Sequence, residues 1–262
     1  MQNRFSKLDK QLRQLFTEPI SLLHFCSIYK QTPEKIDRWR SFNDVSRDTL
    51  QLQKTIVADK LISIGSSNDD VLIDDLFMVI GQWALEFLGC NKITFTDAER
   101  TRLQRKCCDK INLHCQGADV DAGVFLNVML KVTRSLSGSA GTTYSFAHKS
   151  TQERLAAHYI TEQMLGTDKP SLTDMGVTPE TSPSFLEVLQ YVLQDLSSSS
   201  PRQFQKRWPQ LRDALTAAGV TRGGDWQAVL LRSPEVTALA KHAAKITIKE
   251  TDVWDVHSGE SM

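Results

Sequence analysis

The sequence predicts a mainly α-helical protein in which one short β-hairpin interrupts a series of helices. Three observations support this. Apolar residues recur every three or four positions along most of the chain. Alternation with period two is confined to residues 132–148. Segments rich in Gly, Pro, Ser and Asp divide the chain. We therefore expect a helical domain over residues 1–65, a winged-helix domain (three helices and a small β-hairpin) over 70–165, and a C-terminal helical domain over 183–246.

The composition is that of a folded, water-soluble protein. The 262 residues are 40% hydrophobic and 24% charged, with 31 basic and 31 acidic side chains. This balance gives no basic excess for a nucleic-acid partner, and zero net charge is compatible with a homo-oligomer. Five scattered cysteines are typical of a reduced compartment. The polar first residues and the interrupted apolar stretch 76–88 predict neither a signal peptide nor a membrane span, so we expect a cytoplasmic protein.

The first predicted domain contains three helices and a loop. The helices cover residues 5–16, 20–30 and 48–64, and the segment 31–46 reads as a loop or short turn. The segment 20–30 is apolar on most sides, which predicts a buried helix. The polar stretch 65–70 reads as a linker.

The second predicted domain follows a winged-helix plan. A strongly apolar helix spans 71–88, and Gly89 is placed to end it in the left-handed conformation. Thr96 and Glu99 form a capping box for a helix that runs to residue 114, and a third helix spans 119–131. Strands over 132–136 and 143–148 then form the hairpin.

The last part of the chain again reads as helical. Residues 166–183 form a second boundary. Further helices are predicted over residues 183–196, 201–218, 225–231 and 234–245. Residues 250–262 are predicted to be poorly ordered.

The segment 144–159 is the most informative in the chain. Tyr144, Phe146 and His148 alternate with small residues, as in a strand. Ser150 and Glu153 then form a predicted capping box for a helix to residue 165. His148 therefore stands beside the amides at a helix start, where an anion such as phosphate can be held.

This segment resembles the end of the winged-helix domain in the NACHT family of signalling ATPases, which includes the NLR innate immune receptors. The family pattern, Phe-x-His-x-Ser/Thr-x-Gln-Glu-x-x-Ala-Ala, is matched by Phe146, His148, Ser150, Gln152, Glu153, Ala156 and Ala157. Thr151 and Arg154 depart from the residues that are usual there. Residues 17–26 are similar to the start of the family's first helical domain, and residues 76–88 to its first winged-helix helix.

The resemblance implies a nucleotide switch. It implies that His148 faces the diphosphate of bound ADP, that Pro19 packs on the nucleotide, and that exchange for ATP permits oligomerisation. The chain has neither Gly-x-x-x-x-Gly-Lys-Ser/Thr nor an apolar strand ending in an acidic pair for magnesium. The implied nucleotide-binding domain therefore lies upstream of Met1. ADP or ATP is expected only in the full-length context, and this portion is expected to be regulatory rather than an enzyme.

Simpler explanations exist for each candidate residue. His148 can merely cap the hairpin, and Pro19 can merely start a helix. The chain would then be an autonomous helical protein–protein interaction module, an adaptor or a decoy, with no nucleotide role. A winged helix can also bind DNA, but acidic residues interrupt the basic ones in the helix 96–114.

No metal site or catalytic set is predicted. Cys107 and Cys108 are adjacent on a helix and so point about 100° apart. With His114 and Cys115 at the end of that helix, they do not follow the usual spacing of zinc ligands.

Overall fold

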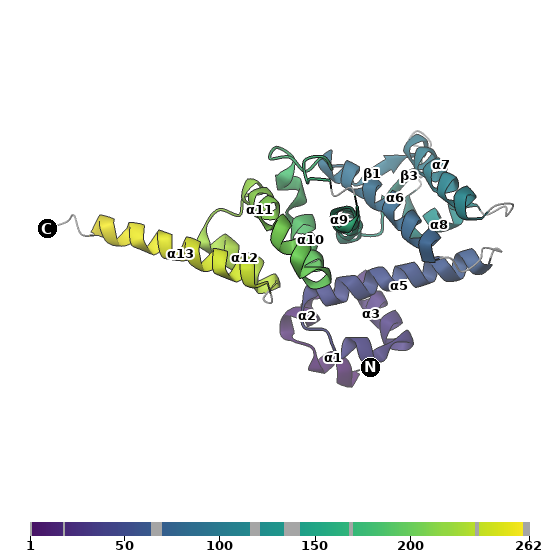
Figure 1. Ribbon diagram of the computed structural model, residues 1–262. Helices are drawn as coiled ribbons and strands as arrows, with labels where there is room; N and C mark the ends of the chain where they lie inside the picture. The colour runs from purple at the N-terminus through teal and green to yellow at the C-terminus, as the bar shows by residue number, and fades with distance from the viewer. Residues whose placement is uncertain are drawn as a thin grey trace. The chain divides into compact units, whose positions relative to one another are not determined.

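The computed structural model describes residues 2–17, 19–63, 70–115, 121–133, 142–167, 170–233 and 236–258. These residues form thirteen α-helices, a 3-10 helix and a three-stranded antiparallel sheet (Figure 1). The protein is therefore mainly helical with a small sheet, as predicted. The chain divides into two compact units, residues 1–159 and 160–262, and the division falls within helix α9.

The chain begins with five helices that share an aromatic core. They are α1 (Gln2–Lys7), α2 (Lys10–Leu15), α3 (Pro19–Gln31), α4 (Pro33–Ile36) and α5 (Phe42–Ser63). The ring of Phe25 lies at the centre of this core, with ring centroids of Phe16 at 5.1 Å and Trp39 at 6.0 Å. Edge-to-face pairs at such distances stabilise a core beyond the area they bury.

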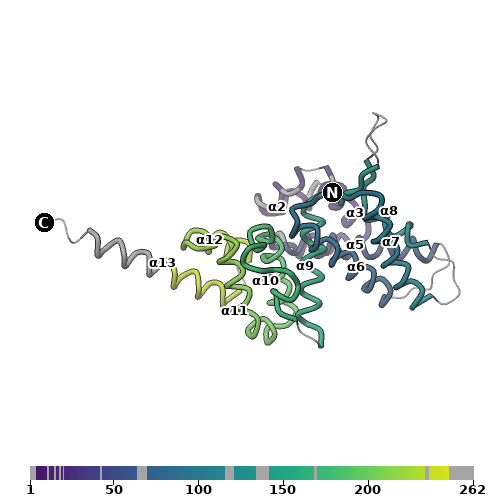
Figure 2. The backbone as a smooth tube through the Cα atoms, turned by 90° about the horizontal axis from the view of Figure 1, so that it is seen from above, coloured from purple at the N-terminus to yellow at the C-terminus, as the bar shows by residue number. Residues whose placement is uncertain are grey.

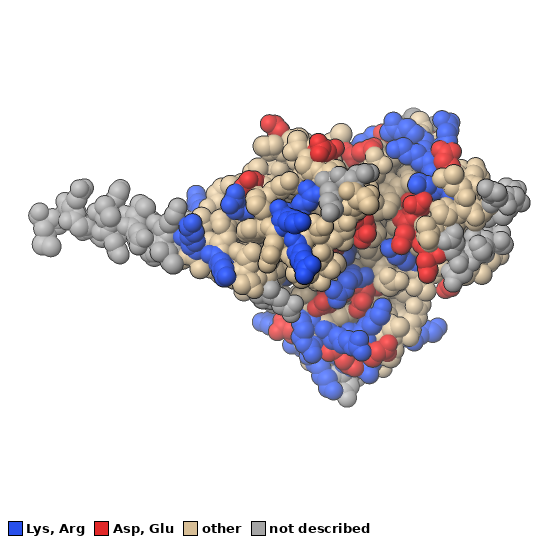
Figure 3. Space-filling view, viewed as in Figure 1, with Lys and Arg blue, Asp and Glu red and all other residues tan. Residues whose placement is uncertain are grey.

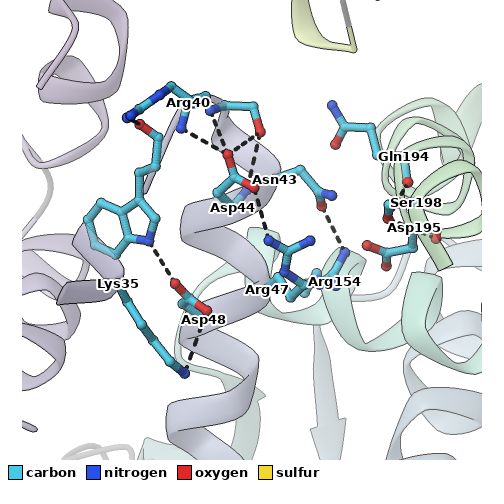
Figure 4. A network of polar contacts seen from close by, with 12 residues as sticks. Lys35, Arg40, Asn43, Asp44, Arg47, Asp48, Arg154, Gln194, Asp195 and Ser198 are labelled. Atoms are coloured by element: carbon cyan, nitrogen blue, oxygen red, sulfur yellow. Dashed lines mark hydrogen bonds and ion pairs between the residues drawn. The ribbon is translucent and has the colours of Figure 1, made fainter. Parts of the chain in front are cut away.

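Three predictions for this region were wrong. The predicted helix 5–16 is two short helices, and the predicted loop 31–46 contains α4 and the start of α5. Helix α5 begins early because the Asp44 carboxylate accepts the amide hydrogens of Arg40 and Ser41, each at 2.9 Å (Figure 4). Helix α3 is not buried on most sides, since Leu22 and Leu23 are 43% and 59% exposed.

The three strands of the sheet belong to the part of the chain that runs from helix α6 to helix α9. In chain order the elements are α6 (Asp70–Gly89), β1 (Thr94–Thr96), α7 (Asp97–His114), α8 (Ala122–Met129), β2 (Leu130–Thr133), β3 (Thr143–Phe146) and α9 (Lys149–Leu165). The strand order is β1-β3-β2, with Tyr144 of β3 opposite both Phe95 and Val132. The predicted hairpin is confirmed as β2 and β3, whereas strand β1 was not predicted. Helix α7 packs alongside α6 (Figure 2). Residues 65–69 of the predicted linker and the hairpin tip 134–141 lie outside the described residues.

Helix α6 is the central apolar helix of the first unit, and eleven of its residues are buried. It ends differently from the prediction. Gly89 is still helical, and the residue with positive φ is Asn91, at 51°. Asparagine enters the left-handed region more readily than most residues. The amide of Lys92 then donates to the Phe87 carbonyl at 2.8 Å, which closes the turn before β1.

The remaining elements are helical. They are η1 (Ser182–Phe185), α10 (Leu186–Ser199), α11 (Pro201–Ala217), α12 (Gly223–Arg232) and α13 (Thr237–Ser258). Pro201 occupies the first turn of α11, as expected for a residue whose missing N–H is not needed there. Helix α13 includes residues 250–258, and residues 259–262 of the segment predicted to be poorly ordered lie outside the described residues. Among the described residues, no helix is both long and apolar enough to cross a bilayer.

Candidate functional site

His148 caps the start of helix α9. It follows β3 and immediately precedes Lys149, the first residue of the helix. Its Nδ1 atom accepts the amide hydrogen of Ser150 at 3.2 Å and lies 2.7 Å from the Ser150 hydroxyl. Its carbonyl accepts the amide hydrogens of Thr151 at 3.1 Å and Gln152 at 3.4 Å. His148 thus makes hydrogen bonds to three backbone amides and one hydroxyl at the start of the helix.

The predicted capping box of Ser150 and Glu153 was therefore wrong. The helix starts before Ser150, so its hydroxyl belongs to the first turn and points to the His148 ring. Glu153 forms an ion pair with Lys149 at 3.2 Å, across one helical turn. The His148 imidazole, and not the Ser150 hydroxyl, therefore accepts an amide hydrogen at the start of α9.

These hydrogen bonds assign the tautomer of the His148 ring. Because Nδ1 accepts from a backbone amide, the proton of the neutral ring sits on Nε2. The side chain is half-buried. A fixed imidazole with a protonated Nε2 can donate a hydrogen bond to an anionic oxygen such as that of a phosphate.

The residues after His148 fix α9 to neighbouring elements. Gln152 is 1% exposed, and its Nε2 donates to the carbonyls of Ala84 at 3.4 Å and Lys92 at 3.2 Å. Arg154 is also buried, and its Nη1 donates to the Asn43 side-chain oxygen in α5 at 3.2 Å (Figure 4). Such buried polar groups need partners, so these bonds set the position of the α9 start.

Helix α9 also packs closely against α6. Gly81 of α6 faces the backbone carbonyl of Leu155, and a Cβ atom at Gly81 would lie 2.7 Å from that oxygen. Ala156 and Ala157, both part of the family pattern, are fully buried. The absence of a side chain at Gly81 therefore allows α6 to approach the backbone of α9 closely at Leu155.

The other end of β3 is tied to helix α7. The Tyr144 hydroxyl donates to the Asp97 carboxylate at 2.7 Å, and the Arg100 guanidinium lies 5.1 Å from the Tyr144 ring centroid. The predicted capping box of Thr96 and Glu99 is confirmed at the start of α7. Helix α7 therefore helps to fix the position of β3, and His148 follows the C-terminal end of this strand.

Pro19, the second candidate residue, is the first residue of α3 and is exposed. Its position suits a proline, which lacks the amide hydrogen that a first helical residue leaves unused. Pro19 and His148 belong to different elements, and no described contact joins them.

The cysteines near the end of α7 do not gather. Cys107 is buried, and desolvation raises the pKa of its thiol to about 12, so it stays uncharged. His114 instead contacts Asp75 at 3.2 Å. Within the part of the chain that the structure describes, no three His, Cys, Asp or Glu side chains are placed to hold a metal ion.

No protein-family model and no curated protein matches this chain. The geometry around His148 is therefore the feature from which a function can be inferred. Sequence reasoning missed Gln152 and Arg154 as residues that position the site. The available signal was the presence of two long polar side chains beside Leu155 and Ala156, which lie on the buried side of α9.

Proposed function

We propose that this chain is the regulatory, non-hydrolytic portion of an NLR-like NACHT signalling ATPase. It would contribute ADP-sensing contacts and control oligomerisation in the cytoplasm. The observation that carries this proposal is the placement of His148 between β3 and α9, with Nδ1 engaged locally and the ring proton on Nε2.

The order of elements supports the proposal. From α6 to β3 the chain runs helix, strand, helix, helix, strand, strand, which is the order of a winged helix with β2 and β3 as its wing. The resemblance places its sensor histidine directly after such a wing. His148 occupies that position here.

The chemistry also indicates how much this chain can do alone. A neutral donor beside a helix start contributes only about 0.3–1 kcal/mol per interaction with an exposed anion. One such contact does not bind ADP tightly. The proposal therefore requires an upstream nucleotide-binding domain that makes most of the contacts with the nucleotide. His148 would add one hydrogen bond to its phosphates.

A DNA-binding role is disfavoured by helix α8. In helix-turn-helix proteins the recognition helix enters the major groove with polar and basic side chains. Helix α8 has the sequence AGVFLNVM, which contains no basic residue, and five of its eight residues are buried. This composition favours a role for α8 in the core.

The second candidate is an autonomous helical interaction module without a nucleotide role. Each family-pattern residue near His148 has an intramolecular contact that explains it without a ligand. The exposed Leu22 and Leu23 on α3 would suit a protein partner. Under this alternative His148 is only a helix cap.

Two substitutions in the complete protein separate these roles. His148→Leu removes both the cap and the Nε2 donor, whereas His148→Asn keeps a good N-cap residue but not the imidazole. If His148 senses ADP, both variants should retain ADP about two- to fivefold less well, since a contact worth about 0.3–1 kcal/mol is lost. His148→Leu should also favour the active, oligomeric state.

Stability provides the control for this experiment. Only His148→Leu should lower the free energy of unfolding, by about 0.5–2 kcal/mol, because it loses the cap. Equilibrium dialysis with labelled ADP and thermal unfolding measure the two effects. Unchanged ADP retention in both variants would contradict the sensor role and leave the capping role.

A further inference from the structure

Helix α7 carries three cations on one face. Arg102, Arg105 and Lys106, which we call the α7 basic cluster, stand three and four residues apart and so share a side of the helix. Figure 3 shows basic side chains gathered over the α7 region. No carboxylate of the described residues lies within ion-pair distance of these three side chains. By contrast, Lys110 on the same helix pairs with Asp75 at 3.1 Å.

Two members of the cluster are held against an aromatic ring. The Arg102 guanidinium carbon lies 4.8 Å from the Trp83 ring centroid, and the Lys106 ammonium lies 5.9 Å from it. Trp83 belongs to α6 and is 1% exposed, so the ring is a fixed support. A guanidinium stacked on a ring keeps its edge N–H donors available. Because the side chains are already restrained, they lose less entropy when they bind.

We propose that the α7 basic cluster docks an acidic segment of a protein partner. Arg102 and Lys106 are four residues apart, a rise of about 6 Å along the helix. A surface of this length accommodates two or three carboxylates. The planar Arg donors suit bidentate pairing with Asp or Glu side chains. This docking surface involves neither His148 nor a nucleotide, so it stands or falls independently of the proposed function.

The charges around the cluster favour a short acidic segment over a nucleic acid. Asp97 and Glu99 precede the cluster on α7, and Asp109 follows it. A DNA duplex carries one negative charge per about 1.7 Å and extends well beyond the cluster. Its phosphates would therefore meet these carboxylates. A short peptide can place its own carboxylates on the cations alone.

The test uses the 262-residue chain and a fluorescein-labelled hexaglutamate peptide as the probe, with a hexaglutamine peptide as the uncharged control. Fluorescence anisotropy measures binding at about 50 and 300 mM salt. The test variant is Arg102→Gln/Lys106→Gln. The matched control is Arg202→Gln/Lys206→Gln, which removes two exposed cations at the same spacing from α11. Both variants have the same net charge.

We expect hexaglutamate to bind in a salt-sensitive manner and hexaglutamine not to bind. The α7 variant should bind hexaglutamate about tenfold more weakly, and the α11 variant should bind it normally. Circular dichroism checks that both variants are folded. Equal loss in the two variants, or absence of hexaglutamate binding, would overturn the proposal. Displacement of the peptide by a tenfold lower concentration of duplex DNA would also overturn it, in favour of nucleic acid.

Discussion

The close approach of α6 and α9 at Gly81 makes a sharp prediction about stability. In Gly81→Ala, the new Cβ would lie 2.7 Å from the Leu155 carbonyl oxygen and 2.9 Å from the Tyr159 Cβ, whereas ordinary contacts begin at 3.4 Å. The oxygen belongs to the backbone, so it cannot rotate away. The two helices must separate, and the hydrogen bonds of Gln152 at the α9 start are then strained.

The magnitude follows from two opposing effects. Overpacking costs about 1–3 kcal/mol, and a backbone contact belongs at the upper end of that range. Alanine has a helix propensity about 1 kcal/mol better than that of glycine. We therefore expect Gly81→Ala to lower the free energy of unfolding by about 2 kcal/mol. For a unit of this size, that corresponds to a decrease in Tm of about 4–8 °C.

A second glycine provides the control. Gly224 in α12 has nothing within 4 Å of the position of a Cβ atom, so Gly224→Ala should raise stability by about 0.5–1 kcal/mol. Differential scanning calorimetry gives the Tm of each variant, and hydrogen exchange of α6 and α9 amides locates the effect. An increase in Tm for Gly81→Ala, similar to that for Gly224→Ala, would refute the close approach and the positioning of α9 that depends on it.

Two further predictions concern α9. Gln152→Met keeps the length of the side chain but removes its donor, so the buried Ala84 carbonyl and the partly buried Lys92 carbonyl each lose a hydrogen bond; chemical denaturation should show a loss of about 1–3 kcal/mol. Burial, together with the nearby Lys54 and Arg154 charges, lowers the pKa of His158 to about 3. The unfolded chain therefore takes up this proton first, and stability should fall as the pH decreases from about 6.5 toward 3, by at most about 1.4 kcal/mol per pH unit. His158→Gln should flatten that part of the stability profile, and an unchanged profile would show that the imidazole is not buried as described.

Much of the fold follows from local signals in the sequence. The capping box of Thr96 and Glu99 and the proline in the first turn of α11 mark helix starts that the structure confirms. The hairpin follows from alternation. Strand β1 is too short for periodicity, and it exists because Phe95 pairs with Tyr144, which is far along the chain. Such a non-local partner cannot be read from three residues.

The candidate site was predicted in position but not in detail. The sequence placed His148 between a strand and a helix, which the structure confirms. It could not tell whether His148 or Ser150 provides the cap, because both can accept an amide hydrogen and helix starts vary by one or two residues. The attachments of Gln152 and Arg154 depend on partners in α6, the turn at Lys92 and α5, so they appear only when the chain is folded.

The most direct test of the proposed function is the size and nucleotide content of the native polypeptide. An antibody raised against residues 170–185 would isolate it, and mass spectrometry with chromatography of heat-released nucleotide would analyse it. The account predicts a product much larger than 29.5 kDa that carries ADP in near-stoichiometric amount. A stable product of 29.5 kDa without nucleotide would contradict the account and favour an autonomous interaction module.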